Sequence, residues 1–145
     1  MKNKKIMIVC RAIILDGDKM LLVENRKNEN NFYCTAGGKM EFGENPKQTL
    51  EREIFEELGV KPEIGRLLYI NTFNDGETQA VDFLYEVLNI NDYKNIEKLK
   101  GTHSHELSKI VWLDRSSDAK VLPEQMWQDF KNDNLPKDKE RYING

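Results

Sequence analysis

The chain is poor in the features that mark secreted and membrane proteins. It has 2 cysteines among 145 residues, Cys10 and Cys34, and neither belongs to a CxxC motif. We therefore expect buried thiols in a reducing compartment instead of a disulfide framework or a zinc site. Arg11 ends the apolar run near the N-terminus, and no other apolar run approaches the length of a membrane span. These absences predict a cytoplasmic protein without a membrane partner.

The sequence also lacks a concentration of basic residues. The formal net charge is −3, and the lysines and arginines are scattered along the chain. This distribution disfavours general nucleic-acid binding. No linker rich in proline, glycine or serine and no internal repeat divides the chain. We expect one domain over residues 1–145, with residues 133–145 as a loose polar tail.

Strand and helix patterns alternate along the chain. The apolar runs and the turn residues between them predict two hairpins, followed by a last strand and a terminal helix. In order, these elements are 6–15 with 19–24, 64–73 with 78–88, 106–114 and 123–132. Between the hairpins lies an acidic segment that predicts a further helix over residues 46–58. The mixture predicts an α/β fold.

The ends of the acidic helix carry clear local signals. Asn45 suits the N-cap, Pro46 suits the first helical position, and Gln48 can complete a pair of the capping-box type. Gly59 suits the residue just past the helix end. Leu50 lies on the apolar face of this helix, opposite a face that carries several glutamates.

Three of these glutamates, Glu53, Glu56 and Glu57, stand at i,i+3 and i,i+4 spacing. Like charges at these spacings each cost about 0.2–0.5 kcal/mol. The three also crowd the C-terminal half of the helix, where the macrodipole disfavours anions. A solvated charged face is the alternative interpretation, but a helix shaped by stability alone would carry lysine there. Converging carboxylates suit a divalent cation such as Mg²⁺, so the pattern predicts a metal site.

The segment from Gly38 to Val60 follows the spacing G-x5-E-x7-R-E-U-x-E-E-x-G-U, with U an apolar residue, at each specified position. The chain thereby resembles the Nudix hydrolases, in particular nucleoside triphosphate pyrophosphohydrolases of the mutator type. The resemblance implies an α/β/α sandwich around a mixed β-sheet. It also implies Mg²⁺-dependent cleavage, with Mn²⁺ as an alternative metal, of the diphosphate linkage in a nucleoside diphosphate joined to another group.

The resemblance leaves the substrate of the chain open. A small nucleotide is implied, and cleavage of a nucleoside triphosphate to the monophosphate and pyrophosphate is the favoured reaction. A pyrophosphatase of nucleotide sugars or ADP-ribose and a non-catalytic, nucleotide-sensing Nudix module are the alternatives. Family members are often homodimers, so a homodimer is expected here.

The resemblance also implies roles for the charged residues of the box. Glu56 and Glu57 correspond to the principal metal ligands, and Glu53 to a further ligand or to the base that orients the attacking water. Arg52 corresponds to a structural arginine that pairs with a box carboxylate at i,i+4.

Other box residues correspond to structural positions. Gly38 lets the backbone turn close to the metal, Glu44 ties the loop to the helix, and Gly59 ends the helix. Lys39 resembles the lysine that contacts phosphate in some members. Ala36 stands where members commonly have proline before the glycine pair.

Outside the box, single residues have two interpretations each. Arg11 interrupts an apolar strand and needs an anion, from either a structural salt bridge or the substrate. Arg26 contacts a phosphate or stays in a solvated loop. Glu106 corresponds to the late glutamate that some members use as base or extra ligand. His103 and His105 fit a flexible polar loop better than a zinc site, because no third ligand is evident. A base-stacking ring or simple core packing are the alternatives for the strand aromatics: Phe32, Tyr33, Phe73, Phe83 and Tyr85.

Overall fold

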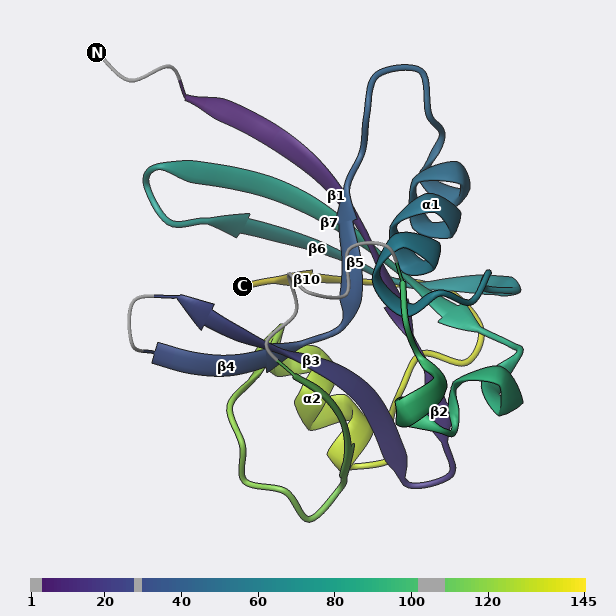
Figure 1. Ribbon diagram of the computed structural model, residues 1–145. Coiled ribbons are helices and arrows are strands. Elements are labelled where there is room, and N and C mark those ends of the chain that lie inside the picture. Colours follow the sequence, from purple (N-terminus) through teal and green to yellow (C-terminus); the bar gives the residue numbers. More distant parts are fainter. Residues whose placement is uncertain (1–3, 28–29, 102–108) are drawn as a thin grey trace.

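The computed structural model describes the backbone of residues 4–27, 30–101 and 109–145, and its strands form two sheets (Figure 1). The first sheet has five strands in the order β10-β6-β7-β1-β5. It is mixed, because β1 runs parallel to β7 and β10 runs parallel to β6, while its other pairs are antiparallel. Its strands are β1 (Lys5–Ile13), β5 (Ala36–Lys39), β6 (Ile64–Asn74), β7 (Thr78–Val87) and β10 (Arg141–Asn144).

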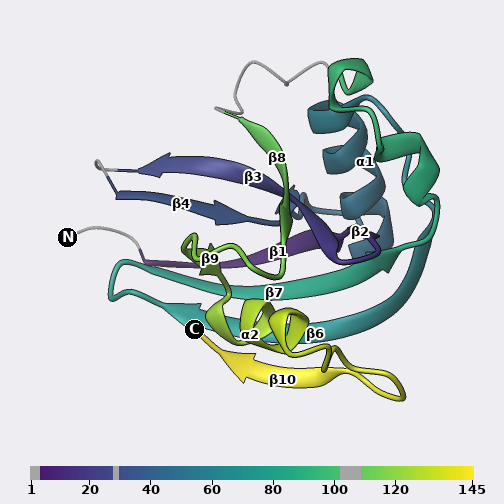
Figure 2. The same ribbon diagram turned by 90° about the horizontal axis from the view of Figure 1, so that it is seen from below.

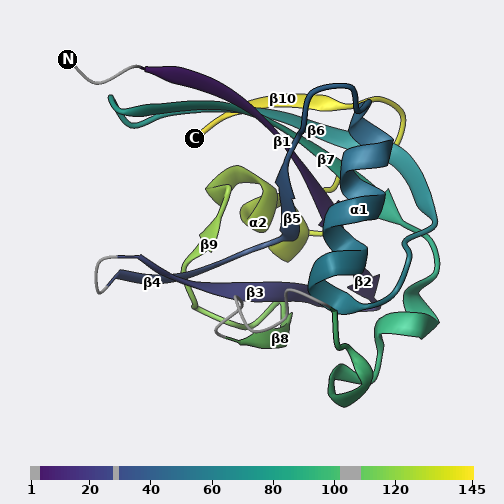
Figure 3. The same ribbon diagram turned by 45° about the horizontal axis from the view of Figure 1, so that its top comes forward.

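The second sheet faces the first and diverges from it, as Figure 3 shows. Its order is β2-β3-β4-β9, and β8 pairs with β3. These strands are β2 (Leu15–Asp16), β3 (Lys19–Lys27), β4 (Asn30–Cys34), β8 (Ile110–Asp114) and β9 (Val121–Leu122). Two α-helices, α1 (Pro46–Leu58) and α2 (Glu124–Lys131), and two short 3-10 helices, Ile90–Tyr93 and Ile96–Lys98, complete the described elements.

Each α-helix packs on its own buried cluster of apolar side chains. The α1 core contains Leu50, Ile54 and Leu58, and the α2 core contains Met126, Trp127 and Phe130. Strand β1 contributes Cys10 and Ala12 to the α1 core and Ile13 to the α2 core. Strands thus separate the two helices, and the predicted α/β sandwich is confirmed. No helix within the described ranges has the length and apolar character to cross a membrane.

The first predicted hairpin, 6–15 with 19–24, is wrong for most of its length. Only Leu15–Asp16 pairs there, with the start of β3. Strand β1 instead pairs along its whole length with β7, and its residues 9–12 pair with β5. The second half of β1 has buried apolar residues on both faces, Val9, Cys10, Ala12 and Ile13, so its sequence carries no alternation that would select one neighbour over another.

The expected loose tail is also wrong, because residues 141–144 form β10 at the edge of the first sheet, beside β6 (Figure 2). Arg141 of β10 donates to the carboxylate of Asp129 in α2 at 2.6 Å. Asp129 is buried and also accepts from the hydroxyl of Tyr69 at 2.6 Å and from Gln125. A buried carboxylate needs such partners, and the polar C-terminal segment supplies one of them.

Helix α1 ends against residues 100–101. Gly59 has φ 78° in the left-handed region, and its N–H donates to the carbonyl of Phe55 at 2.9 Å. A Cβ on Gly59 would collide with the carbonyl of Lys100, and one on Gly101 would overlap the carbonyl of Glu56. The close approach of two backbones therefore fixes the last turn of α1.

Candidate active site

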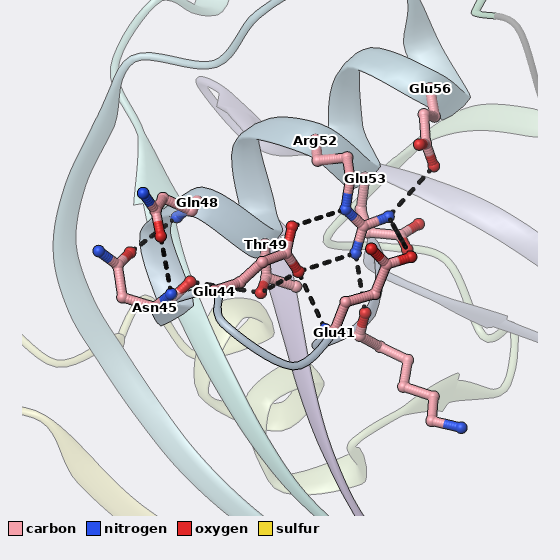
Figure 4. Close-up of polar contacts among 9 residues, drawn as sticks. Glu41, Glu44, Asn45, Gln48, Thr49, Arg52, Glu53 and Glu56 are labelled. Atoms are coloured by element: carbon pink, nitrogen blue, oxygen red, sulfur yellow. Dashed lines mark hydrogen bonds and ion pairs between the residues drawn. The ribbon is translucent and has the colours of Figure 1, made fainter.

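The N-terminus of α1 is held as the sequence predicted. The backbone N–H of Gln48 donates to Oδ1 of Asn45, and the backbone N–H of Asn45 donates to Oε1 of Gln48, both at 2.9 Å (Figure 4). Pro46 occupies the first turn. This capping box fixes the helix start relative to the preceding loop, which carries Glu44.

Arg52 donates to three carboxylates and one carbonyl group, and its Nη1 also lies 3.8 Å from a fourth carboxylate, that of Glu41 (Figure 4). Its Nε and Nη2 donate to the two oxygens of Glu44 at 2.7 and 3.0 Å. Its Nη1 lies 2.9 Å from Oε1 of Glu53 and 3.3 Å from Oε2 of Glu56. Nη2 also donates to the carbonyl of Lys39 at 3.0 Å. The predicted pairing at i,i+4, with Glu56, is present, and the guanidinium reduces the repulsion between the box glutamates.

Glu44 links the loop to the helix through both of its oxygens. Besides Arg52, it accepts from the backbone N–H of Glu41 at 2.9 Å and from the hydroxyl of Thr49 at 3.0 Å. The hydrogen bond from Arg52, followed by the one from Glu41, lowers the pKa of Glu44 to about 2. The same contacts, led by Glu44, raise the pKa of Arg52. These contacts join the loop that carries Glu44 to helix α1.

Glu57 and Glu53 lie against the glycine pair of β5. Oε2 of Glu57 accepts from the N–H of Gly37 at 3.2 Å. A Cβ on Gly38 would overlap the carboxyl group of Glu53. The absence of a side chain on Gly38 therefore makes the space that the Glu53 carboxylate occupies.

These carboxylates have the chemistry that a divalent cation requires, although they are not gathered around one point. Among the residues that the structure describes, no three acidic, histidine or cysteine side chains converge as a metal site. Glu53 and Glu56 face Arg52, while Glu57 faces Gly37. Carboxylate oxygens are the preferred ligands of Mg²⁺. Glu53, Glu56 and Glu57 would have to turn from these partners to hold a cation together.

A cavity of about 340 Å³ opens between the two sheets. The first sheet lines it with alternate residues of three strands, and the second sheet and the segment before α2 line the opposite side. The lining includes Met7, Val9, Arg11, Asn71, Phe73, Ala80 and Asp82 from the first sheet, and Asn25, Phe32, Cys34, Leu122 and Pro123 opposite. Volumes of this order suit small-molecule ligands.

Arg11 connects the cavity to the box. It lies opposite Gly37 in the register of β1 and β5, and Gly37 binds Glu57. Its Nη1 donates to the carbonyl of Thr35 at 3.0 Å and lies 3.8 Å from Sγ of Cys34. Within the described ranges Arg11 forms no ion pair, so the salt-bridge interpretation gains no support. Burial raises the pKa of the Cys34 thiol, while Arg11 lowers it and Glu57 raises it.

The remaining predicted residues are exposed, line the cavity, pack on the cores or have side chains outside the described residues. Lys39 has an exposed side chain beside the glycine pair. Arg26 belongs to β3, but its side chain is outside the described residues, as are Glu106, His103 and His105. Of the strand aromatics, Phe32 and Phe73 line the cavity, whereas the others pack on the two cores: Tyr33, Phe83 and Tyr85.

The sequence interpretation missed two polar residues of the cavity wall. Asn71 and Asp82 are both buried, face each other across β6 and β7, and are joined by a hydrogen bond of 3.0 Å. The predicted hairpin with its turn at 74–76 contained the signal, because its register sets position 71 opposite position 82. A charged residue and an amide at facing positions of two apolar strands indicate a shared polar site.

Comparison with known proteins agrees with this geometry. The NUDIX domain model matches residues 6–131. The NAD-capped RNA hydrolase NudC of Mannheimia succiniciproducens is 32% identical over 85 residues, which are 53% of this chain but only 32% of that relative. The nucleoside triphosphatase NudI of Enterobacter sp. (strain 638) is 29% identical over 122 residues, 76% of this chain and 82% of that protein.

A solved structure supports the same fold. The crystal structure of a MutT NUDIX hydrolase from Burkholderia pseudomallei superposes with a TM-score of 0.70 at 20% identity, covering 88% of this chain and 98% of that chain. The match to the family model spans most of the chain and includes the whole box from Gly38 to Val60. The chain therefore belongs to the Nudix family, whose hydrolases act on nucleoside diphosphate derivatives, and it is a pyrophosphohydrolase as the sequence predicted.

Proposed function

We propose that the protein cleaves the diphosphate linkage of a nucleotide with Mg²⁺ or Mn²⁺ held by Glu53, Glu56 and Glu57. The observation that supports this most is the cluster around Arg52, which holds two of these glutamates next to the glycine pair. The favoured substrate is a nucleoside triphosphate, converted to the monophosphate and pyrophosphate. The name of the NudI relative, a nucleoside triphosphatase, agrees with this choice.

The chain's own groups have distinct roles in this proposal. A bound divalent cation supplies positive charge that offsets the charge developing on the diphosphate and acidifies a water molecule. Arg52 keeps Glu53 and Glu56 close together, and Glu53 serves as a third ligand or as the base that orients the water. Arg11, at the wall of the cavity nearest the box, donates to a phosphate oxygen.

Three further roles rest on the family resemblance. Lys39 is exposed beside Gly38 and is proposed to contact an outer phosphate. Arg26 is proposed as a second phosphate contact and Glu106 as an additional base or ligand. The side chains of these last two lie outside the described residues, so mutagenesis is the direct test of both.

Phosphate release tests the proposal, coupled to an inorganic pyrophosphatase for nucleoside triphosphates. For nucleotide sugars and ADP-ribose it is coupled to an alkaline phosphatase, which hydrolyses the phosphate monoesters that their cleavage yields. We expect release that requires Mg²⁺ or Mn²⁺ and stops in EDTA. Glu57→Gln should lose at least about a hundredfold in turnover, which corresponds to about 2.7 kcal/mol of transition-state stabilisation. Glu51→Gln is the matched control, because Glu51 lies on the same helix and pairs with the exposed Lys61 at 3.8 Å. It should retain turnover within about twofold.

The outcomes separate the alternatives. Near-normal turnover of Glu57→Gln would reject the metal assignment. Release from none of the nucleotides would favour the non-catalytic, nucleotide-sensing module. An independent readout is the melting temperature, which millimolar Mg²⁺ should raise more than Na⁺ of equal ionic strength does, because a ligand that binds only the folded state stabilises it.

The setting of the protein is also a proposal. A cytoplasmic, reducing location agrees with the buried, unpaired thiols of Cys10 and Cys34. A homodimer is proposed from the family resemblance, and light scattering tests it against the mass of 17.0 kDa for one chain. A solution mass equal to that of one chain would reject the dimer.

A further inference from the structure

The polar wall of the cavity contains a buried acceptor without a partner. Asn71 is 2% exposed and Asp82 is 7% exposed. Nδ2 of Asn71 donates to Oδ2 of Asp82, whereas Oδ1 of Asn71 has no hydrogen-bond partner. Buried polar atoms are nearly always paired. Since both residues line the cavity, the unpaired oxygen indicates a ligand that brings a donor.

The neighbouring carboxylate fixes which end of the amide is presented. If the Asn71 amide were turned over, its Oδ1 would face Oδ2 of Asp82, and two acceptors would repel each other. The carboxylate therefore keeps Nδ2 directed at itself. The pair presents oxygens to an occupant of the cavity and selects for N–H groups.

The surroundings of the pair suit a flat ring. Phe32 and Phe73 line the cavity from opposite sheets, and Ala80, two residues before Asp82, leaves room beside the carboxylate. Aromatic side chains on two sides favour a planar, stacked ligand. The polar pair then reads the edge of that ring.

The position of the pair also suits a nucleotide. Asp82 lies opposite Val9 in β1, and Arg11 follows two residues later, about 6.6 Å along the strand. A ring at Asp82 can therefore direct its phosphates toward Arg11 and the box. This part of the reasoning rests on the proposed function, because it takes the ligand to be a nucleotide.

We propose that Asn71 and Asp82 select the base of the substrate by accepting hydrogen bonds from its exocyclic amino group. Cytosine, adenine and guanine carry such a group. Uracil and thymine carry a carbonyl oxygen in place of the amino group of cytosine, and hypoxanthine carries one in place of that of adenine; this oxygen would face two acceptors. Hypoxanthine also lacks the amino group of guanine and has only hydrogen there. The pair thus acts as a specificity determinant within the cavity.

Binding of nucleoside monophosphates, measured by calorimetry in EDTA, tests the inference without requiring hydrolysis. The probes are GMP against IMP, which differ by the amino group alone, and CMP against UMP and AMP against IMP, in which a carbonyl oxygen replaces the amino group and the adjacent ring nitrogen gains a hydrogen. We expect the tightest ligand to carry an amino group and its partner to bind at least about tenfold more weakly, because a site built for a hydrogen bond rejects the analogue that lacks it.

Asp82→Asn keeps the shape of the side chain but exposes a donor, since its own Oδ1 must accept from Asn71. The ratio within the preferred pair should fall below about threefold or reverse. Asp75→Asn is the matched control, because Asp75 lines the same cavity from the exposed hairpin turn. It makes the same change of charge and should leave the ratio unchanged within about twofold.

Equal binding within every wild-type pair, or no binding of any probe, would overturn the inference even if nucleotides are hydrolysed. The same conclusion follows if Asp82→Asn and Asp75→Asn change the ratio equally. A retained amino preference together with no hydrolysis of any nucleotide would reject the proposed function and leave the inference standing. If Asp82→Asn fails to fold, the wild-type ratio alone decides.

Discussion

Replacing Arg52 by glutamine should cost the metal-free protein a large part of its stability. Arg52 is 24% exposed and Glu44 is 18% exposed, and two hydrogen bonds of 2.7 and 3.0 Å join them. A hydrogen bond to a charged group contributes about 1.5–3 kcal/mol, and the partial exposure places this pair near about 2 kcal/mol. Unscreened repulsion between Glu53 and Glu56 adds about 0.2–0.5 kcal/mol. For a chain of this size the melting temperature should fall by roughly 6–12 °C.

A double-mutant cycle in EDTA isolates the contact. The variants are Arg52→Gln, Glu44→Gln and their combination, unfolded in urea. We expect a coupling free energy of about 1.5–2 kcal/mol between the two sites. The control cycle uses Lys61→Gln and Glu51→Gln, whose pair is 3.8 Å apart and exposed to 73% and 43%. Its coupling should stay below about 0.5 kcal/mol. Equal couplings in the two cycles would show that Arg52 does not anchor the loop to the helix.

Three other predictions concern single residues. Arg52 lowers the pKa of Glu44 from 4.5 to about 2, so Glu44→Gln should be less stable than wild type in EDTA at neutral pH. Urea titrations should show that this difference in stability disappears as the pH falls from about 4.5 through about 2. Burial raises the pKa of Cys10 to about 11, so mass spectrometry should find this thiol unmodified by iodoacetamide at pH 8 in the folded protein and modified in urea. Modification at equal rates in the folded protein and in urea would contradict the burial of Cys10. Gly38→Ala should reduce kcat/KM at least tenfold, because the added methyl overlaps the Glu53 carboxyl group, and its melting temperature should fall less than that of Arg52→Gln.

The acidic helix was predictable to the residue because its boundaries depend on adjacent side chains. Asn45 and Gln48 cap one end and Gly59 closes the other, and all three signals act within one turn. The contact of Arg52 with Glu56 follows from helical spacing alone. Its contacts with Glu44 depend on the loop path, which only the family resemblance suggested.

The strand partners were not predictable in the same way. Strand β1 pairs with β7, some 70 residues later in the chain, and its second half, which is buried on both faces, gives no periodic signal about its neighbours. The C-terminal segment looked too polar to be ordered, yet Arg141 satisfies the buried Asp129. The pair of Asn71 and Asp82 was missed because the two residues are 11 positions apart in the sequence and only the hairpin register brings them together.

The contact between the end of α1 and residue 101 bears on how mutational scans of this protein should be interpreted. Gly101 has no functional group, but any side chain there would push against the carbonyl of Glu56 and displace the turn that carries Glu57. A scan scored by activity would rank position 101 beside the acidic positions, for a purely steric reason. A library aimed at new base preference should therefore hold positions 59 and 101 as glycine and vary positions 71 and 82.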